Sequence, residues 1–422
     1  MLPNFFMRRL QYNQQTLRFF VTMMALGFTI DGVYAVVFNL YLLRLGYDTT
    51  FIGQVNSIGL LVFAAMSLPA GIFGSWWTSS RMLRVGIGFI LLGSSLLPLV
   101  EWTPQAWHEI WLILTYALIL AGFSLYFVNG APFLMGVVRR DEQNRAFAMQ
   151  TALLSLAGFI GGLVGGTFPE LIGFFQNLSL DDPQPYRYTL MLVALVMFIA
   201  FLVTWTIHGR VDDLDDEPRE IPQTQNAHKG GFTKTIIILI GLMSLVRFLQ
   251  VAGVGTASIF INVYLDTELK ASTATIGTIM ALARFVSIPM VLLAPRLIHR
   301  WGIGAVAVGA SFSTALFLIP LAIIPHWWAA AIAYVATQSF SSLRFTAFIV
   351  YIMLLVPKHQ QAVMAGAGEM AAGSSFAIMA LSGGYILAAF SFRDLFLMGA
   401  GLSGLGSLIF WWHIKTSKGW ER

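Results

Sequence analysis

Five charged side chains stand inside long apolar stretches of this sequence: Asp31, Arg247, Arg284, Arg344 and Glu369. A charge near the middle of a membrane-spanning helix costs about 2.5–3.5 kcal/mol, so each needs a partner or a function. A guanidinium carries five donors that fit a carboxylate or a phosphate, and a carboxyl group can take up and release a proton. The set therefore predicts binding of an anionic group next to a carboxyl group that can carry a coupling ion.

Polar side chains share helix faces with two of these arginines. Gln250 lies three residues after Arg247, and Ser341 lies three residues before Arg344, so each pair faces the same side of a helix. We expect substrate contacts from Arg247, Arg284, Arg344, Gln250, Asn129, Gln338, Tyr34 and Tyr126. For the last four of these residues, helix packing is the alternative role.

The two acidic residues of the set have more than one possible role. Asp31 can be a protonation site, a cation ligand or the partner of an arginine. Glu369 can pair with Arg344 and stabilise the second half of the chain, or both can line a binding site. We expect Asp31 and Glu369 to take part in coupling to protons, and we expect Arg247 and Arg284 to contact the substrate.

The elements that must position these residues are membrane-spanning helices. Hydrophobic residues make up 57% of the 422 positions, charged residues make up 11%, and the mean hydropathy is +0.75. A soluble domain has roughly 25% charged residues, so this composition excludes a water-soluble fold. Apolar runs of about 20 residues predict twelve spans, near 17–44, 51–75, 82–101, 109–138, 146–174, 187–208, 235–265, 272–297, 303–325, 328–356, 361–390 and 394–413.

Several classes of function lack the residues that they need. The chain has no cysteine, no nucleotide-binding loop of the form Gly-x-x-x-x-Gly-Lys-Ser/Thr and no His-Glu-x-x-His helix. Its histidines fall in loops or at span ends. We therefore expect no enzyme, no metal and no cofactor. The net charge of +5 predicts no nucleic-acid partner, because basic residues in membrane proteins set orientation.

Basic residues are distributed unequally between the two ends of the predicted spans. With the N-terminus in the cytoplasm, about eighteen Lys and Arg side chains face that compartment, while four face the other side, namely Arg44, Arg187, Lys270 and Arg393. The asymmetry predicts a multi-pass protein of the cell membrane with both termini in the cytoplasm. We expect a monomer, with the lipid bilayer and a small-molecule substrate as its partners.

A polar segment divides the chain into halves that repeat one another. We expect six-helix bundles at 1–208 and 235–422, joined by a hydrated cytoplasmic linker at 209–234 that carries six acidic residues. Three short motifs recur in the same order: Asn39-Leu40-Tyr41-Leu42 matches Asn262-Val263-Tyr264-Leu265, Ile52-Gly53 matches Ile276-Gly277, and Gly165-Gly166 matches Gly383-Gly384. Such internal repeats are characteristic of transporters.

Two loops resemble a motif of the major facilitator superfamily, which follows a Gly-x-Leu-Ala-Asp-Arg-x-Gly-like pattern. The loop after the eighth span reads Pro295-Arg296-Leu297-Ile298-His299-Arg300-Trp301-Gly302, and the loop after the second span has Ser75 at the aspartate position. The resemblance covers essentially the whole chain. It implies an all-α membrane protein with twelve transmembrane helices in two pseudo-symmetric six-helix bundles. It also assigns to the gating motif Gly71, Arg81, Arg84, His299, Arg300 and Gly302.

The fifth span resembles the antiporter signature of the same family, with Gly162 at the position of its proline. The resemblance implies secondary active transport by alternating access. Together with the buried arginines, it leads us to expect a small organic solute that is anionic or amphiphilic, with proton coupling and export. A nutrient importer, a drug or lipid exporter and, in another class, a non-transporting receptor or scaffold are the alternatives.

Overall fold

The computed structural model describes residues 13–139, 142–207, 234–357 and 361–416. Within these ranges all regular structure is helical. The predicted linker and its acidic run lie outside the described residues, apart from Lys234, which begins a helix.

Six spans form each half of the chain. The first span joins α1 (Gln14–Leu26), a π-helical segment η1 (Gly27–Tyr34) and α2 (Ala35–Arg44). The rest of the first half consists of α3 (Thr49–Trp76), α4 (Ser79–Leu96) with the 3-10 segment η2 (Leu97–Trp102), a short η3 (Gln105–Trp107), α5 (His108–Val137), α6 (Gln143–Gln176) and α7 (Gln184–Trp205). The second half consists of α8 (Lys234–Thr267), α9 (Thr273–Trp301), α10 (Ile303–Ile323), α11 (Trp327–Leu354), α12 (Gln361–Ala389) and α13 (Phe392–Thr416).

Eleven of these spans, in the part of the chain that the structure describes, are long and apolar enough to cross a bilayer. The twelfth is α11, which has 28 residues but carries a run of polar side chains that includes Thr337, Gln338, Ser341 and Arg344. Polar residues inside a membrane helix face the bundle interior or a watered cavity. The low hydropathy of α11 therefore marks a helix that lines the interior.

A side-chain N-cap begins the second span of each half. The Asp48 side chain accepts a hydrogen bond of 2.9 Å from the Phe51 amide at the start of α3. The Ser272 hydroxyl accepts one of 3.3 Å from the Thr275 amide at the start of α9. Both residues satisfy an amide that a helix leaves free at its N-terminus. The repeat seen in the sequence thus extends to the helix caps.

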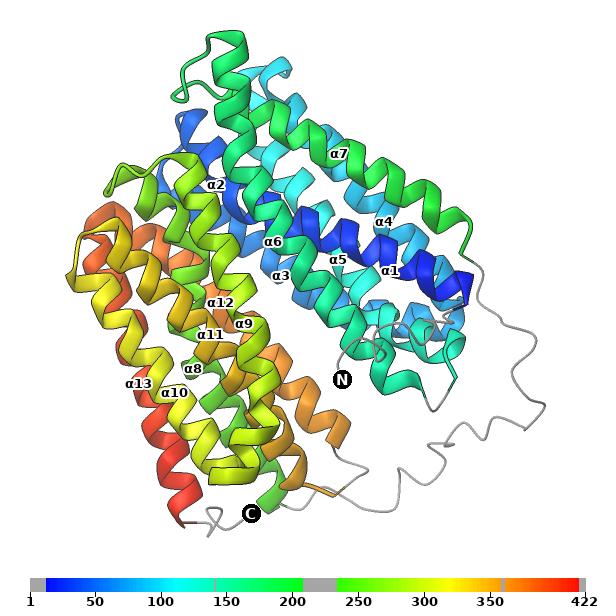
Figure 1. Cartoon of the computed structure of the whole chain (residues 1–422), viewed down its shortest axis with the longest axis vertical. Helices are drawn as coiled ribbons and strands as arrows, with labels where there is room; N and C mark the ends of the chain where they lie inside the picture. Colours follow the sequence, from blue (N-terminus) through cyan, green and yellow to red (C-terminus); the bar gives the residue numbers. More distant parts are fainter. Residues whose placement is uncertain (1–12, 140–141, 208–233, 358–360, 417–422) are drawn as a thin grey trace, which may run out of the picture.

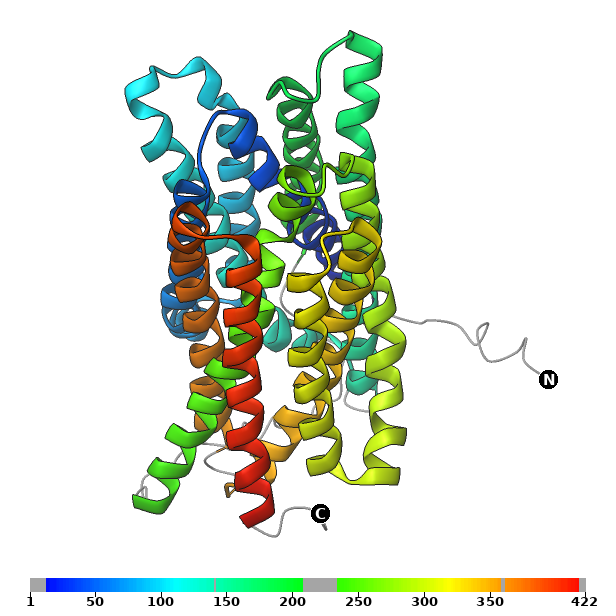
Figure 2. The ribbon, with the colours of Figure 1, turned by 90° about the vertical axis from the view of Figure 1, so that its left-hand side faces the viewer.

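The two halves pack in the same way. In the first half α4 packs on α5 and α7, and η1 packs on α6; in the second half α10 packs on α11 and α13, and α8 packs on α12. The two bundles meet at one end and diverge toward the other (Figure 1). We call the diverging end, where α1 and α8 begin and α7 and α13 finish, the open end, and the opposite end the closed end. A view from the side shows that α8 (light green) and α13 (red) both extend to the lower end of the second bundle, which is the open end (Figure 2).

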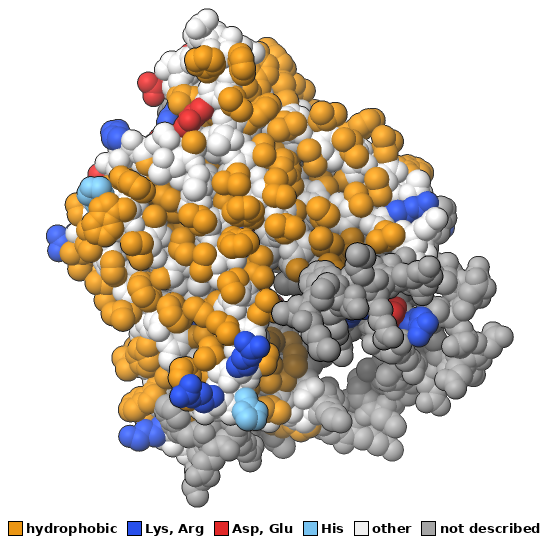
Figure 3. Space-filling view, viewed as in Figure 1, with side chains coloured by type: hydrophobic (Ala, Val, Ile, Leu, Met, Phe, Trp, Pro, Cys, Tyr) orange, Lys and Arg blue, Asp and Glu red, His pale blue; other side chains and the backbone are white. Residues whose placement is uncertain are grey.

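The outer surface fits a lipid environment. Large apolar side chains are exposed along the helices, as at Leu114 and Leu316, which expose 63% and 61% of their surface. The space-filling view shows apolar side chains over most of one face, with charged side chains gathered near the ends of the helices (Figure 3). This distribution is that of a multi-pass membrane protein.

Two glycine contacts join the bundles at the closed end. A Cβ on Gly53 of α3 would lie 3.0 Å from the Cα of Gly384 on α12, and a Cβ on Gly277 of α9 would lie 2.5 Å from the Cα of Gly166 on α6. Each pair joins the glycine of the Ile-Gly motif in one half to the second glycine of the Gly-Gly motif in the other half. Lipid supplies no hydrophobic force between helices, so such close backbone contact is what joins them. The closed end is therefore a symmetric seal.

Polar contacts complete the seal near its axis. The Asn39 amide donates to the carbonyl of Ile259 at 2.7 Å, and the Asn262 amide donates to the carbonyls of Ala35 and Val36, each at 3.1 Å. Arg44 reaches Asp266 with two hydrogen bonds of 2.8 and 2.6 Å. A bidentate pair of this kind is stronger than a single contact. All these contacts cross from one bundle to the other and would have to break if the closed end opened.

We expect Gly277→Ala to destabilise the seal without unfolding either bundle. Its methyl group would lie 2.5 Å from the Gly162 carbonyl oxygen, so α9 must move away from α6. Spin labels on cysteines at Asp182 and Glu268 should then report longer distances across the closed end. Gly309→Ala on α10 is the matched control, because nothing lies within 4 Å of its added Cβ. Equal distance distributions for the two variants would show that the glycine contact does not hold the seal.

Candidate substrate-binding site

A cavity of about 560 Å³ lies between the bundles, on the open side of the seal. Its walls come from α6, α8, α9, α11 and α12. Four of the predicted substrate residues line it: Arg247, Arg284, Arg344 and Gln338. The other lining residues are Ala148, Thr151, Ala152, Ser155, Val251, Val254, Ser287, Ile288, Val291, Leu292, Ser341, Ser342, Phe345, Thr346 and Phe376. The cavity is therefore apolar over much of its wall, with three guanidinium groups set into it.

One ion pair beside the cavity joins the two bundles. The Arg284 guanidinium on α9 lies 2.8 Å from the Asp31 carboxylate on η1. The two side chains expose 45% and 24% of their surface, so water reaches both. Of the three roles expected for Asp31, the structure shows the one in which it pairs with an arginine.

Asp31 lies in a segment with unusual geometry. Its helix is π-helical from Gly27 to Tyr34, and π-helical turns occur frequently at functional sites. Glycines allow this segment to lie directly on α6: a Cβ on Gly161 would lie 2.2 Å from the Phe28 carbonyl oxygen. The neighbouring Gly162 faces the other bundle, because its added Cβ would lie 3.2 Å from the Ala281 side chain of α9. The antiporter-like glycines thus allow close contact with η1 on one side of α6 and with α9 on the other.

Glu369 contacts Arg247, and not Arg344 as one of the two sequence interpretations had it. The nearest oxygen and nitrogen of the pair are 3.5 Å apart, and the Glu369 side chain is 58% exposed while that of Arg247 is 7% exposed. The Arg247 guanidinium also lies over the ring of Phe345, 4.8 Å from its centroid. Arg344 does not pair with Glu369 because its guanidinium is buried and is hydrogen-bonded to Gln250 and Ser341. The pair with Glu369 is a long, partly hydrated contact and binds Arg247 weakly.

Arg344 is the most deeply buried of the three arginines. It exposes 2% of its surface and donates to Gln250 Oε1 at 3.2 Å and to Ser341 Oγ at 3.1 Å. Both acceptors are neutral, and Nε of Arg344 has no hydrogen-bond partner among the described residues. A buried guanidinium without an acidic partner is costly and strongly attracts an anion. Arg344 therefore places an uncompensated positive charge in the wall of the cavity.

Other predicted substrate residues serve helix packing. The buried Asn129 amide donates to the carbonyls of Ala70 and Leu125 and so joins α5 to α3. The Tyr126 hydroxyl contacts that of Thr22, and its ring stacks on Phe19. Tyr34 is buried against other aromatic rings in the first bundle. Gln250 lies behind Arg344 and orients it.

The predicted gating residues all lie at the open end, on separate bundles. Arg81 and Arg84 belong to the first turns of α4, whereas His299 and Arg300 are in the last turn of α9. Gly302 has a φ of 80°, which allows α9 to end and α10 to begin at once. Gly71 is exposed on α3. Their role in gating stays a prediction.

Sequence reasoning missed part of the cavity wall. Thr151 and Ser155 of α6 line it and lie four residues apart, a spacing that puts them on one helix face. That signal was present beside the glycines of the same span. Phe345 and Phe376 also line the cavity, but nothing in their sequence surroundings separates them from the many lipid-facing phenylalanines.

Comparisons with known proteins agree with this geometry. A sequence model of the Major Facilitator Superfamily matches residues 19–245, and a model described as the MFS_1 like family matches residues 182–398. The chain belongs to the major facilitator superfamily. This membership makes it a secondary transporter of a small molecule, and it confirms the predicted fold of twelve helices in two bundles. No curated protein matches the sequence.

Several solved structures of the superfamily share the fold. A mutant of nucleoside transporter NupG matches with a TM-score of 0.70 at 15% identity, covering 94% of this chain and 98% of that one. A D-xylose-proton symporter matches with a TM-score of 0.72 at 11% identity, covering 94% and 97%. A bacterial homologue of the human lysosomal transporter Spinster, inward-facing and unoccupied, matches with a TM-score of 0.67 at 12% identity, covering 95% and 96%. At these identities the likeness establishes the fold alone.

We expect cysteine accessibility to distinguish the cavity residues from the packing residues. The chain has no cysteine, so any label reports the introduced one. Ser341→Cys and Ser287→Cys line the cavity and should react quickly with a membrane-impermeant maleimide in purified protein. Asn129→Cys is buried between α3 and α5 and should react only after unfolding. Rapid labelling at position 129 in folded protein would place that residue in the water-filled path.

Proposed function

We propose that this protein transports a small organic anion, or an amphiphile with an acidic group, by proton-coupled alternating access. The single observation that carries the proposal is the buried Arg344, which lies in the wall of a cavity and has no acidic partner among the described residues. We further propose that both termini are cytoplasmic and that the membrane is the cell membrane, so the open end faces the cytoplasm.

The charge balance of the cavity supports an anionic cargo. Three guanidinium groups line it, and two carboxylates, those of Asp31 and Glu369, contact two of them. One positive charge is left over, and it belongs to the most buried of the three side chains. A carboxylate or phosphate can accept two parallel hydrogen bonds from a guanidinium, which makes such a group the natural partner of Arg344.

The apolar part of the wall supports an organic cargo over a simple inorganic ion. Val254, Ile288, Phe345 and Phe376 line the cavity beside the arginines. Binding sites for small organic molecules combine apolar walls with a few placed polar groups, and the cavity volume of about 560 Å³ lies in the range usual for them. The site suits a molecule with an acidic head and an apolar body.

Asp31 is the proposed coupling residue. It contacts Arg284 of the other bundle, so its charge affects the attraction between the two bundles. Protonation of Asp31 would remove that attraction and leave Arg284 free to bind an anion. The Asp31 carboxylate and an anionic cargo would then compete for Arg284, so binding of a proton to Asp31 favours binding of the anion, which is a physical means of coupling the two. The direction that we propose is export, on the basis of the antiporter-like glycines of α6.

The first test concerns the cargo. Benzoate serves as an anionic probe, with benzamide and benzylamine as neutral and cationic probes of similar shape. We expect benzoate alone to raise the thermal stability of the purified protein. Arg344→Gln should weaken this effect by roughly 10-fold to 100-fold in concentration, because a hydrogen bond to a charged group contributes about 1.5–3 kcal/mol.

The control for this test is Arg296→Gln, which removes an exposed arginine outside the cavity. It should leave the benzoate response unchanged. A protein that responds to benzylamine only, with or without Arg344, would contradict the anionic cargo. Stabilisation without any flux of the probe in proteoliposomes would favour a receptor over a transporter.

The second test concerns coupling. Asp31→Asn keeps the shape of the side chain and removes its charge, so it should abolish proton-driven accumulation of the bound probe in proteoliposomes. Exchange of labelled for unlabelled probe should continue, because it needs no net proton movement. The matched control is Glu101→Gln, which removes a carboxylate that pairs with Arg187 inside the first bundle, at 2.8 Å. Full accumulation by the Asp31 variant would exclude this residue as the coupling site.

A further inference from the structure

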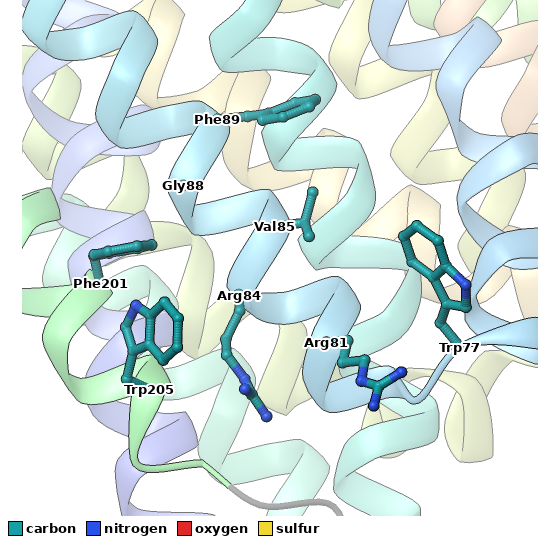
Figure 4. A pocket seen from close by; sticks show the side chains of 8 residues that line it. All are labelled: Trp77, Arg81, Arg84, Val85, Gly88, Phe89, Phe201 and Trp205. Carbon is teal, nitrogen blue, oxygen red and sulfur yellow. The ribbon is translucent and has the colours of Figure 1, made fainter.

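A second cavity, of about 500 Å³, lies on the outside of the first bundle at the open end. It is bounded by Trp77 at the end of α3, by α4 from Arg81 to Phe89, and by Phe201 and Trp205 of α7. Figure 4 shows Arg84 between Trp205 and Arg81 at the lower end of α4, with Val85 and Phe89 further along the same helix. This cavity takes no part in the substrate site described above.

The two ends of this cavity differ in chemistry. Arg81 and Arg84 lie at the end where the helices leave the membrane, and the lining residues include no acid. The opposite end is apolar and is formed by Val85, Phe89 and Phe201. Cationic and apolar groups are therefore arranged in the order in which a phospholipid presents its headgroup and its acyl chains.

Arg84 has donors that the protein leaves unused. Its Nη2 donates to the Ile207 carbonyl at a long 3.4 Å, and its Nε is buried without a hydrogen-bond partner among the described residues. Its guanidinium lies 5.9 Å from the ring centroid of Trp205. Arg81 is exposed and makes no ion pair with a described residue. Two guanidinium groups without an acidic partner among the described residues thus line the same end of the cavity.

Trp77 and Trp205 place the cavity at the membrane interface. They expose 53% and 57% of their surface on either side of the arginines. Tryptophan is enriched at the level of the lipid headgroups. Arginines at that level are attracted to the anionic headgroups of the adjacent leaflet.

We propose that this cavity binds an anionic phospholipid of the adjacent leaflet, with its headgroup phosphate on Arg81 and Arg84 and an acyl chain along Val85, Phe89 and Phe201. A free phosphate ion would satisfy the arginines but would leave the apolar half of the cavity unfilled. An acidic peptide would likewise leave the apolar half of the cavity unfilled. A zwitterionic phospholipid would place its cationic group near two guanidinium groups.

The test uses purified, delipidated full-length protein and phosphatidylglycerol with brominated acyl chains, which quench nearby tryptophan fluorescence. We expect saturable quenching by phosphatidylglycerol, and weaker quenching by phosphatidylcholine with the same chains. Trp205→Phe should remove much of the saturable component. Arg84→Gln should weaken phosphatidylglycerol binding about fivefold, and a double variant with Arg81→Gln should weaken it by roughly the square of that factor.

The matched control is Arg296→Gln, which removes an exposed arginine from the open end of the other bundle. It should leave phosphatidylglycerol binding unchanged. Glycerol 3-phosphate and inorganic phosphate serve as headgroup probes without chains. Competition by either of them at concentrations similar to those of the lipid would overturn the proposal in favour of a soluble-anion site.

Two further outcomes would also overturn the proposal. One is quenching that the arginine substitutions do not change. The other is binding that appears only after the six acidic residues of 209–234 are replaced by their amides, which would make that segment the occupant. Because none of these measurements involves transport, a failure here leaves the proposed function intact, and the reverse also holds.

Discussion

Close contact between backbones at the closed end is the constraint on which the rest of the structure depends. In lipid, two bundles gain little by burying apolar surface against each other, so their association relies on small residues and on hydrogen bonds. Glycine at four repeated positions lets α3 meet α12 and lets α6 meet α9. Because the closest of these backbone contacts lie toward one end, the helices diverge toward the other, and the cavity with its arginines lies on that side of them.

Charge inside the membrane is handled in three ways in this protein. Arg44 and Asp266 form a short bidentate pair at the closed end. Arg284 and Asp31 form a single, partly exposed contact between the bundles, and Arg247 makes only a long contact with Glu369. Arg344 has no acidic partner among the described residues and depends on Gln250 and Ser341. The strength of charge compensation thus falls from the seal toward the cavity, as expected where a ligand must complete the site.

The fold was predictable from the sequence to within a few residues, whereas the site was predictable only in part. Long apolar runs predicted the spans, and even the weak repeats proved to be contacts: Gly53 meets Gly384, and Asn39 meets Asn262. The three arginines of the cavity were visible because charge is rare in such helices. The partner of each was not visible, because it depends on helix rotation and side-chain depth. The pair of Arg44 with Asp266 was not predicted, for the same reason.

The π-helical segment of the first span has a mechanical consequence. A π-helical turn holds about one residue more than an α-helical turn. If η1 changed to α-helical hydrogen bonding, α2 would turn about its axis by roughly 100° for each residue taken up. Asp31 lies within this segment, while Asn39 and Arg44 of the seal lie beyond it on α2. Such a change in the hydrogen bonding of η1, next to Asp31, would therefore rotate Asn39 and Arg44 relative to their partners in the other bundle. The first span thus connects the Asp31–Arg284 pair to the contacts of the closed end.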